Sequence, residues 1–360
     1  MREGIVAFLL YKLKKSKQIS RKRRVKMTED IKGFAYRKTP YRFVARYKDG
    51  KWHRGRLTHS SSILLNECAC VLHYAQTCFE GLKAYRLDDG SIVCFRPDQN
   101  EKRLEQSCKR MVIPPLPAGM FTDAVRKVVK ANADYVPSFE SGGSLYVRPL
   151  IFGTDPVLGV KPATEFEFRI FVSPVGNYFA GGVKPLNLRI SDYDRAAPVG
   201  TGHIKAGLNY AMSLYPIVEA HEQGYDENLY LDPLTRTYIE ETGGANIIFI
   251  SKDGSLVTPR SNTILPSITR RSIVEICRDR LGMNVEERKI ALEELADMKE
   301  CALCGTAAVV SPVGTITASD RTYTFKSVGE GSIISRISDV MSDIRSGKMD
   351  SPDGWLMKMI

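Results

Sequence analysis

The N-terminal segment lacks what a membrane span or a secretory leader requires. Its apolar run covers only residues 4–10, whereas a spanning helix needs about 20 predominantly apolar residues. A secretory signal places positive charge before the apolar run and small residues at a cleavage site, but here the basic block follows the run. We therefore expect no membrane partner for this chain.

Paired metal-binding motifs are also missing. The eight cysteines are scattered, and Cys301-Ala-Leu-Cys304 has neither a second CxxC nor a His pair that would complete a metal site. Buried, reduced cysteines in strands are therefore favoured over a redox pair or a metal site. We expect no bound metal and a cytoplasmic location.

Acidic residues are nearly absent from residues 1–26, which contain ten Lys or Arg and one acid, Glu3. This segment accounts for +9 of the net charge of +11, so the other 334 residues carry only +2. The near-neutral body argues against a nucleic-acid partner. We expect residues 1–33 to be a disordered basic extension. The favoured interpretation is a functionless extension, with translation starting at Met27; the alternatives are an organelle-targeting segment and a surface that contacts RNA.

The first half of the chain shows patterns of antiparallel strands and helices, with no internal repeat. Asp49-Gly50 and Asp88-Asp89-Gly90 are turn signals between apolar strands, which predicts two hairpins. The expected elements are strands at 42–47, 51–53, 82–86, 91–95, 144–148 and 167–172, a helix beginning at Pro97 and a helix over 121–135.

The second half follows a glycine-rich segment, residues 176–185, that ends in Pro185. We expect strands at 186–190, 228–231, 237–240 and 246–250, and helices over 209–222, from Thr269, and over 333–344. The sequence thus predicts an α/β (α+β) fold of two domains, 34–175 and 187–360, joined by an interdomain loop at 176–186 and separated by a cleft.

Two residues stand out for their surroundings. Lys205 lies in the glycine-rich run Gly-Thr-Gly-His-Ile-Lys-Ala-Gly-Leu-Asn-Tyr, where glycines allow the backbone to approach a planar ligand, although a lone lysine is usually a solvated charge. Glu241 ends a predicted strand before two glycines. A buried carboxylate needs a cationic partner, and a salt bridge at the strand edge is the alternative.

Three segments could bind a phosphate. Arg96 follows a strand, residues 265–271 precede a helix whose N–H groups and dipole favour an anion, and residues 305–308 form a glycine-led turn with a hydroxyl. Each is weak alone, because a Ser or Thr before a helix is usually a cap.

Taken with two further runs, these segments resemble the branched-chain aminotransferases, which are class IV (fold-type IV) pyridoxal phosphate enzymes. The further runs are 73–81 (His-Tyr-Ala-Gln-Thr-Cys-Phe-Glu-Gly) and 146–149 (Tyr-Val-Arg-Pro). The resemblance covers residues 34–357 and is strongest to bacterial-type members. Leu208 and Ala75 replace glycines usual in the family, and Ala308 and Ser311 stand where some mammalian members have a redox CxxC.

The resemblance implies a role for each cofactor-binding residue. Lys205 would carry pyridoxal phosphate as a Schiff base and shuttle the substrate proton, Tyr210 would bind the ring oxygen, and Glu241 the ring nitrogen. The phosphate would be held by Arg96, Ile268, Thr269 and Thr306. The implied fold is that of the D-amino acid aminotransferases, with a small N-terminal domain, a larger C-terminal domain and the cofactor between them.

The resemblance also implies a substrate pocket and a homodimer. Tyr74 and Val160 would reach the partner subunit's site. The implied substrate-binding residues are Tyr74, Phe79, Gly81, Tyr146, Arg148, Val160, Tyr178, Ala307 and Ala308. An apolar pocket of this kind selects aliphatic side chains by burial, at about 0.8 kcal/mol per methylene.

The implied reaction is reversible amino transfer from L-leucine, L-isoleucine or L-valine to 2-oxoglutarate, giving the 2-oxo acid and L-glutamate by a ping-pong route. The first alternative is another class IV enzyme, a D-amino acid transaminase or an aminodeoxychorismate lyase; the Tyr-x-Arg-Pro run and the chain length argue against it. The second is a non-enzymatic nucleic-acid-binding protein.

Overall fold

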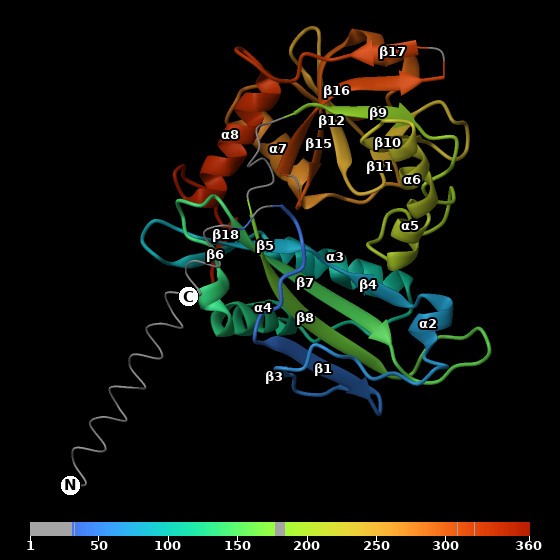
Figure 1. Ribbon diagram of the computed structural model, residues 1–360, viewed down its shortest axis with the longest axis vertical. Helices are drawn as coiled ribbons and strands as arrows, with labels where there is room; N and C mark the ends of the chain where they lie inside the picture. The colour runs from blue at the N-terminus through green and yellow to red at the C-terminus, as the bar shows by residue number, and fades with distance from the viewer. Residues whose placement is uncertain (1–30, 32, 177–183, 308, 320) are drawn as a thin grey trace.

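A computed structural model describes residues 31, 33–176, 184–307, 309–319 and 321–360. Most of the expected N-terminal extension and most of the expected interdomain loop therefore lie outside the described residues. The described strands form two sheets of nine strands each, which lie one above the other in Figure 1. This arrangement confirms the expected α/β organisation with two halves.

The first sheet has the strand order β18-β6-β5-β7-β8-β1-β2, with β3 paired to β1 and β4 paired to β7. Its strands are β1 (Arg42–Lys48), β2 (Lys51–Trp52), β3 (Arg56–Thr58), β4 (Thr77–Phe79), β5 (Leu82–Arg86), β6 (Ile92–Phe95), β7 (Ser144–Gly153), β8 (Phe166–Val175) and β18 (Leu356–Lys358). Its helices are α2 (Cys70–Tyr74), α3 (Pro97–Arg110), α4 (Met120–Ala131) and the short 3-10 helix η1 (Ala133–Tyr135).

Both predicted hairpins are confirmed, since β1 pairs with β2 and β5 with β6, each antiparallel. Asp49 and Gly50 both have positive φ, which a two-residue turn between twisted strands needs. The expected helix over 121–135 is shorter than predicted. Buried Asn132 ends it by accepting from the backbone of Tyr41 and donating to the carbonyls of Tyr41 and Val128.

The second sheet has the order β11-β10-β9-β16-β15-β12-β13-β14, with β17 paired to β16. Its strands are β9 (Leu186–Ile190), β10 (Glu227–Leu231), β11 (Ile239–Thr242), β12 (Asn246–Ser251), β13 (Leu256–Pro259), β14 (Val285–Arg288), β15 (Met298–Gly305), β16 (Val309–Ala318) and β17 (Arg321–Thr324). Its helices are α5 (Gly207–Ala211), α6 (Leu214–Glu222), α7 (Ile268–Asp279), the 3-10 helix η2 (Leu292–Asp297) and α8 (Ile333–Ser346). Because β11 also pairs with β12, six of these strands close into a barrel.

The apolar strand β12 shows how the barrel is packed. Ile247 and Phe249 belong to one apolar cluster, whereas Ile248 and Ile250 belong to another that also contains the buried faces of α7 and α8. Successive strand residues point to opposite faces, so a continuous apolar run is buried on both sides. Helix α7 packs on the barrel through this second cluster, and this contact holds the N-terminus of α7 next to the barrel.

The single helix expected over 209–222 is wrong. The structure has two helices, α5 and α6, with Met212 and Ser213 between them. Pro216 explains the interruption, because proline lacks the N–H that would continue the ladder and its ring clashes with the carbonyl four residues earlier. The break leaves α5 as a short helix directly after Lys205.

The end of the chain returns to the first sheet. Strand β18 pairs antiparallel with β6, and the ring of Trp355 packs against Phe95. The expected boundary at 176–186 assigns β18 to the second domain, although β18 pairs with a strand of the first sheet. The domain boundaries therefore remain a proposal. None of the helices in the described ranges is long and apolar enough to cross a membrane.

Candidate active site

A cavity of about 340 Å³ lies between the two sheets and takes its lining from both halves of the chain. We call it the interdomain cavity. Its lining includes Phe34, Phe79, Gly81, Arg103, Tyr146 and Arg148 from the first half, and Arg195, Lys205, Tyr210, Glu241, Asn246, Leu265, Ser267, Ile268, Gly305, Thr306 and Ala307 from the second. The cleft expected from the sequence is confirmed.

Lys205 is held by an extended segment that pairs with β4. The carbonyl of Lys205 accepts the N–H of Phe79 at 3.0 Å, and the Ser107 hydroxyl accepts the N–H of Lys205 at 3.1 Å. Helix α5 begins directly after Ala206, and this helix places Tyr210 beside Lys205. Lys205 Nζ donates to the Tyr210 hydroxyl at 2.7 Å. An amine and a phenol thus meet in the cavity.

Gly202, three residues before Lys205, is required by the packing of the protein itself. A Cβ on Gly202 would lie 1.9 Å from the carbonyl oxygen of Thr263. The bare backbone therefore makes room for a neighbouring loop of the protein. The expectation that glycines of this run let the backbone approach a planar ligand stays a prediction.

Glu241 lies at the cavity wall, near the end of β11, with an exposed fraction of only 2%. Its carboxylate accepts the N–H of Leu265 at 2.9 Å and the side-chain amide of Asn246 at 2.6 Å. It also pairs with Arg195 at 2.7 Å. Burial nevertheless raises the pKa of Glu241 to about 7, with Arg195 and the Leu265 N–H acting in the opposite direction. The carboxylate is therefore poised to gain from a further cation in the cavity.

The N-terminus of α7 offers a place for an anion. Ser267 caps the helix by accepting the N–H of Arg270, and Ser267 and Ile268 both line the cavity. Thr306, after β15, lies on the same side, and Thr269 lines a small adjoining space of about 20 Å³ with Ile268 and Thr306. Free N–H groups and the helix dipole favour negative charge at such a position.

The opposite part of the cavity is aromatic. The Arg148 guanidinium lies over the Phe79 ring, 4.7 Å from its centroid, and donates to the Tyr146 hydroxyl at 2.8 Å. Phe34 meets the Tyr146 ring edge to face, with the centroids 4.8 Å apart. A Cβ on Gly81 would lie 2.3 Å from the Tyr146 hydroxyl. Glycine at 81 is therefore what lets Tyr146 turn its hydroxyl toward Arg148.

A comparison with protein families decides which family this cavity belongs to. The family model described as amino-transferase class IV matches residues 77–316, about two thirds of the chain. The chain belongs to the class IV aminotransferases. The family resemblance and the fold expected from the sequence are both confirmed.

Two bacterial proteins illustrate the curated relatives of this class IV chain. It is 46% identical over 333 residues to the branched-chain-amino-acid aminotransferase of Haemophilus influenzae, covering 91% of this chain and 97% of that protein. It is 44% identical over 329 residues to the enzyme of the same name from Helicobacter pylori, covering 91% of this chain and 96% of that protein.

Solved structures agree with this class IV fold. The Escherichia coli branched-chain amino acid aminotransferase has a TM-score of 0.75 at 28% identity, covering 90% of this chain and all of that chain. The Thermobaculum terrenum enzyme, solved in its pyridoxal phosphate form, has a TM-score of 0.75 at 25% identity, covering 90% of this chain and all of that one.

Most of the class IV residues predicted from the sequence meet in one place. Ten of them line the interdomain cavity: Lys205, Tyr210, Glu241, Ile268, Thr306, Phe79, Gly81, Tyr146, Arg148 and Ala307. Their individual roles stay predictions. Tyr178 and Ala308 fall outside the described residues.

Four predicted residues lie elsewhere. Thr269 lines the adjoining space and is not in the lining of the interdomain cavity. Arg96 is turned along α7, where its guanidinium donates to Ser272 at 2.9 Å and pairs with Glu275 at 3.1 Å. Tyr74 donates to the carbonyl of Leu158, and Val160 is 87% exposed, so neither lines the cavity of its own chain. For Tyr74 and Val160, a position outside this cavity is compatible with the expectation that they serve a partner subunit.

Two ion pairs at the site were missed by sequence reasoning. Arg195 is the partner of Glu241, and Arg103 of α3 binds Glu80 through two hydrogen bonds of 2.7 and 2.8 Å. Arg103 also donates to the carbonyl of Pro266, just before α7, which ties the two halves together. Glu80 lies in the 73–81 run, but nothing in the spacing of either acid shows which charge it meets.

The cysteines follow the expectation. All eight are free, and seven of them are buried. Cys301 and Cys304 belong to different apolar clusters, on opposite faces of β15. The interpretation of this CxxC as buried strand cysteines is confirmed. The described part of the chain contains no group of three or more His, Cys, Asp or Glu side chains that could hold a metal ion.

Proposed function

We propose that this class IV protein is a pyridoxal phosphate-dependent branched-chain amino acid transaminase, which transfers the amino group of L-leucine, L-isoleucine or L-valine reversibly to 2-oxoglutarate. The observation that carries the proposal is the meeting of Lys205, Tyr210 and Glu241 in one cavity. An amine, a phenol and a buried carboxylate are the groups that the aldehyde, ring oxygen and ring nitrogen of this cofactor need.

The donor set fits pyridoxal phosphate. The α7 N-terminus at Ser267 and Ile268, with the turn at Thr306, would hold the phosphate, while Glu241 would hold the ring nitrogen in its protonated form. The raised pKa of Glu241 fits this role. Burial disfavours the charged carboxylate, and a protonated ring nitrogen beside it would be a cation that stabilises that charge. When bound, the cofactor supplies an electron sink that makes the amino acid's Cα–H acidic.

Lys205 is the group placed to move the proton. Its Nζ donates to Tyr210 and lies 4.9 Å from the Phe79 ring centroid, which keeps the amine inside the cavity. As the free amine, Nζ could accept the proton from the substrate's Cα and donate it to the cofactor carbon that had carried the aldehyde. The Tyr210 hydroxyl orients that amine while it does so.

The walls fit the proposed substrates. Phe34, Phe79 and Tyr146 offer aromatic surface to an aliphatic side chain, and burial gains about 0.8 kcal/mol per methylene. Such a pocket discriminates weakly between chains that differ by one methylene. Arg148 adds one cation, which gives the second carboxylate of glutamate or 2-oxoglutarate a partner at the same wall.

The proposal includes a homodimer in which Tyr74 and Val160 complete the partner's site. The surface around them supports an interface, because Leu72, Leu158 and Val160 are large apolar side chains that are more than half exposed. It also includes a cytoplasmic location, in keeping with eight free thiols.

The decisive experiment measures initial rates with L-leucine, L-isoleucine, L-valine, L-methionine and D-alanine as donors and 2-oxoglutarate as acceptor. We expect the three branched-chain L-amino acids to be the best donors, with rates within about tenfold of each other because methylene discrimination is weak. Preference for D-alanine would assign the chain to the D-amino acid transaminases. Release of pyruvate from aminodeoxychorismate would assign it to the lyases.

A further inference from the structure

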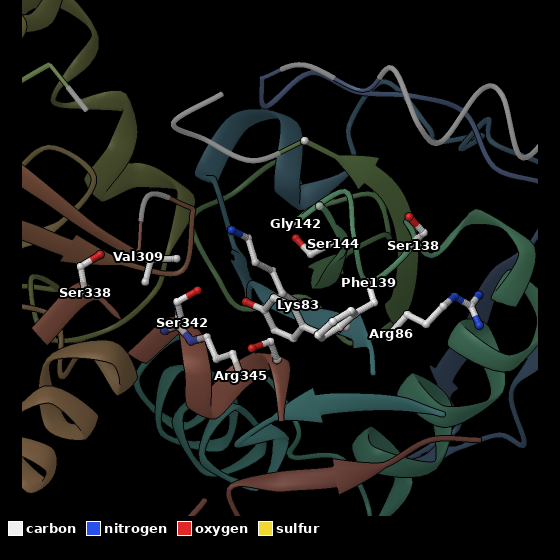
Figure 2. A pocket seen from close by; sticks show the side chains of 14 residues that line it. Lys83, Arg86, Ser138, Phe139, Gly142, Ser144, Val309, Ser338, Ser342 and Arg345 are labelled. Atoms are coloured by element: carbon white, nitrogen blue, oxygen red, sulfur yellow. The ribbon is translucent and has the colours of Figure 1, made fainter. Parts of the chain in front are cut away.

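A second cavity, of about 170 Å³, lies outside the interdomain cavity. Its walls come from β5, from the start of β7 with the loop before it, and from one face of α8. Figure 2 shows the side chains that surround it. The lining residues are Lys83, Tyr85, Arg86, Ser138, Phe139, Gly142, Gly143, Ser144, Gly176, Val309, Ser338, Ser342, Arg345 and Ser346. They include three cations, five serines and no carboxylate.

Two of these cations are buried without a counterion among the residues that the structure describes. Lys83 is 7% exposed and Arg345 is 5% exposed, and among the described residues neither takes part in an ion pair. Nε and Nη1 of Arg345 have no hydrogen-bond partner in the described part of the chain. Burying an unpaired charge is costly. These donors therefore lack the group that would compensate for their burial.

The surroundings of Lys83 and Arg345 also disfavour two positive charges without an anion between them. Burial and the charge of Arg345 lower the pKa of Lys83 to about 7. Lys83 makes one hydrogen bond, to the carbonyl of Ala307 at 2.8 Å, and Arg345 lies over the Phe95 ring. Arg86 differs, because its guanidinium already donates to the carbonyls of Gly90 and Ala133 and extends away from the other two in Figure 2.

We propose that this second cavity is a binding site for a small oxyanion, held by Lys83 and Arg345 and by the serine hydroxyls of α8. Ser338, Ser342 and Ser346 recur every fourth residue, so they lie on one face of the helix, and Ser342 stands close to Arg345 in Figure 2. At about 30 Å³ per water molecule in the liquid, the cavity has room for roughly six waters. Inorganic phosphate or a small dicarboxylate fits that space.

The second cavity is separate from the place proposed for the cofactor's phosphate, at the α7 N-terminus and Thr306, but both adjoin the same small space. The interdomain cavity contains neither Lys83 nor Arg345 in its lining. Both residues do reach the small space beside Thr269 and Thr306. An anion bound in that small space, rather than in the second cavity, would compete with the cofactor's phosphate. The test must therefore be done on cofactor-loaded protein. The proposal does not rest on the transaminase activity.

The experiment is calorimetric titration of the cofactor-loaded full chain with inorganic phosphate and, separately, with malonate, below pH 7 in a buffer without oxyanions. We expect one saturable site per chain. The tighter of the two probes identifies the natural class as a tetrahedral oxyanion or a dicarboxylate. Absence of saturable binding of both probes to the cofactor-loaded chain overturns the proposal.

Ser342 gives a matched pair of variants, because it lines the cavity and its position on α8 is exposed. Ser342→Asp places a carboxylate beside Arg345 and should weaken phosphate binding about tenfold or more. Ser342→Asn has the same shape as the Asp variant without the charge and loses only the hydroxyl, so it should bind phosphate more tightly than the Asp variant does. Equal affinity in the two variants contradicts the proposal. Equal cofactor content and melting temperature in both would show that the Asp variant is folded.

Discussion

At the scale of single residues, the site depends on how each charged group is compensated. Lys205 meets Tyr210 at 2.7 Å, and Glu241 meets Arg195 at 2.7 Å, yet burial still raises the pKa of Glu241 to about 7. The lysine motif and the acid were predictable because the family runs around them are local in sequence. Arg195 as the partner of Glu241 was not, because 46 positions separate them and only folding brings them together.

Lys205→Ala should abolish transamination while leaving weak cofactor binding. The amine that moves the proton is removed, which should lower kcat by a factor of a thousand or so, but the α7 N-terminus and Thr306 remain to hold the phosphate. Turnover and cofactor retention after gel filtration would be measured together. Lys252→Ala, which changes an exposed lysine paired with Asp297, is the control and should remain active. Substantial turnover by the Lys205 variant would refute its assigned role.

Glu241 should give the cofactor-free protein a stability that falls as pH rises. Its pKa is raised in the folded chain, so between about 4.5 and about 7 the folded state holds a proton that the unfolded state has released. The free energy of unfolding therefore decreases across that range. Glu241→Gln lacks this proton and should show a smaller decrease. Denaturant unfolding of both proteins from pH 4.5 to 7.5 checks this, and parallel curves would contradict it.

At the scale of elements, neighbours along the chain were predictable and distant contacts were not. The hairpin of β5 and β6 follows from the turn residues 88–90, and β12 follows from its apolar run. The break between α5 and α6 was missed, although Pro216 is a residue type that interrupts a helix. It matters for the site, since it leaves α5, with Tyr210, as a short helix next to Lys205.

Gly81→Ala tests how β4, β5 and β7 pack at the site. The new Cβ would lie 2.3 Å from the Tyr146 hydroxyl, so the ring must move and its hydrogen bond from Arg148 must lengthen. We expect a loss of about 1–3 kcal/mol in the free energy of unfolding. Adding Tyr146→Phe removes the clashing oxygen and should recover part of that loss. Gly159→Ala, with no atom near its Cβ, is the control. A Gly81 variant as stable as the parent would show that the site adapts freely.

At the scale of the whole molecule, the two halves are joined in ways that their order in the chain does not suggest. The final strand β18 pairs with β6, and Arg103 reaches from α3 to Glu80 and to the carbonyl of Pro266. Figure 1 shows α3, β4 and α5 lying where the two halves meet. The cavity lies there because the lysine segment of one half pairs with β4 of the other.

The proposed dimer predicts complementation between two inactive variants. If Val160 serves the partner's site, Val160→Asp alone and Lys205→Ala alone should each have little activity. A mixed dimer would contain one site with Lys205 from one chain and Val160 from the other. After unfolding and refolding an equal mixture, roughly a quarter of the parent activity should return, because half of the dimers are mixed and each has one intact site. No recovery, with mixed dimers verified by differential tags, would contradict the exchange of Val160 between subunits.

The sequence by itself determined the chemical groups and their local frames: Lys205 five residues before Tyr210, Glu241 at the end of a strand, and a serine-capped helix at Ser267. These follow from local propensity and from motifs whose members are close in the chain. Only the tertiary structure decided which charges meet. It paired Glu241 with Arg195 and Glu80 with Arg103, and among the described residues it gave Lys83 and Arg345 no carboxylate beside the second cavity. Such contacts depend on burial and on chain segments that are distant in sequence, which local patterns do not encode.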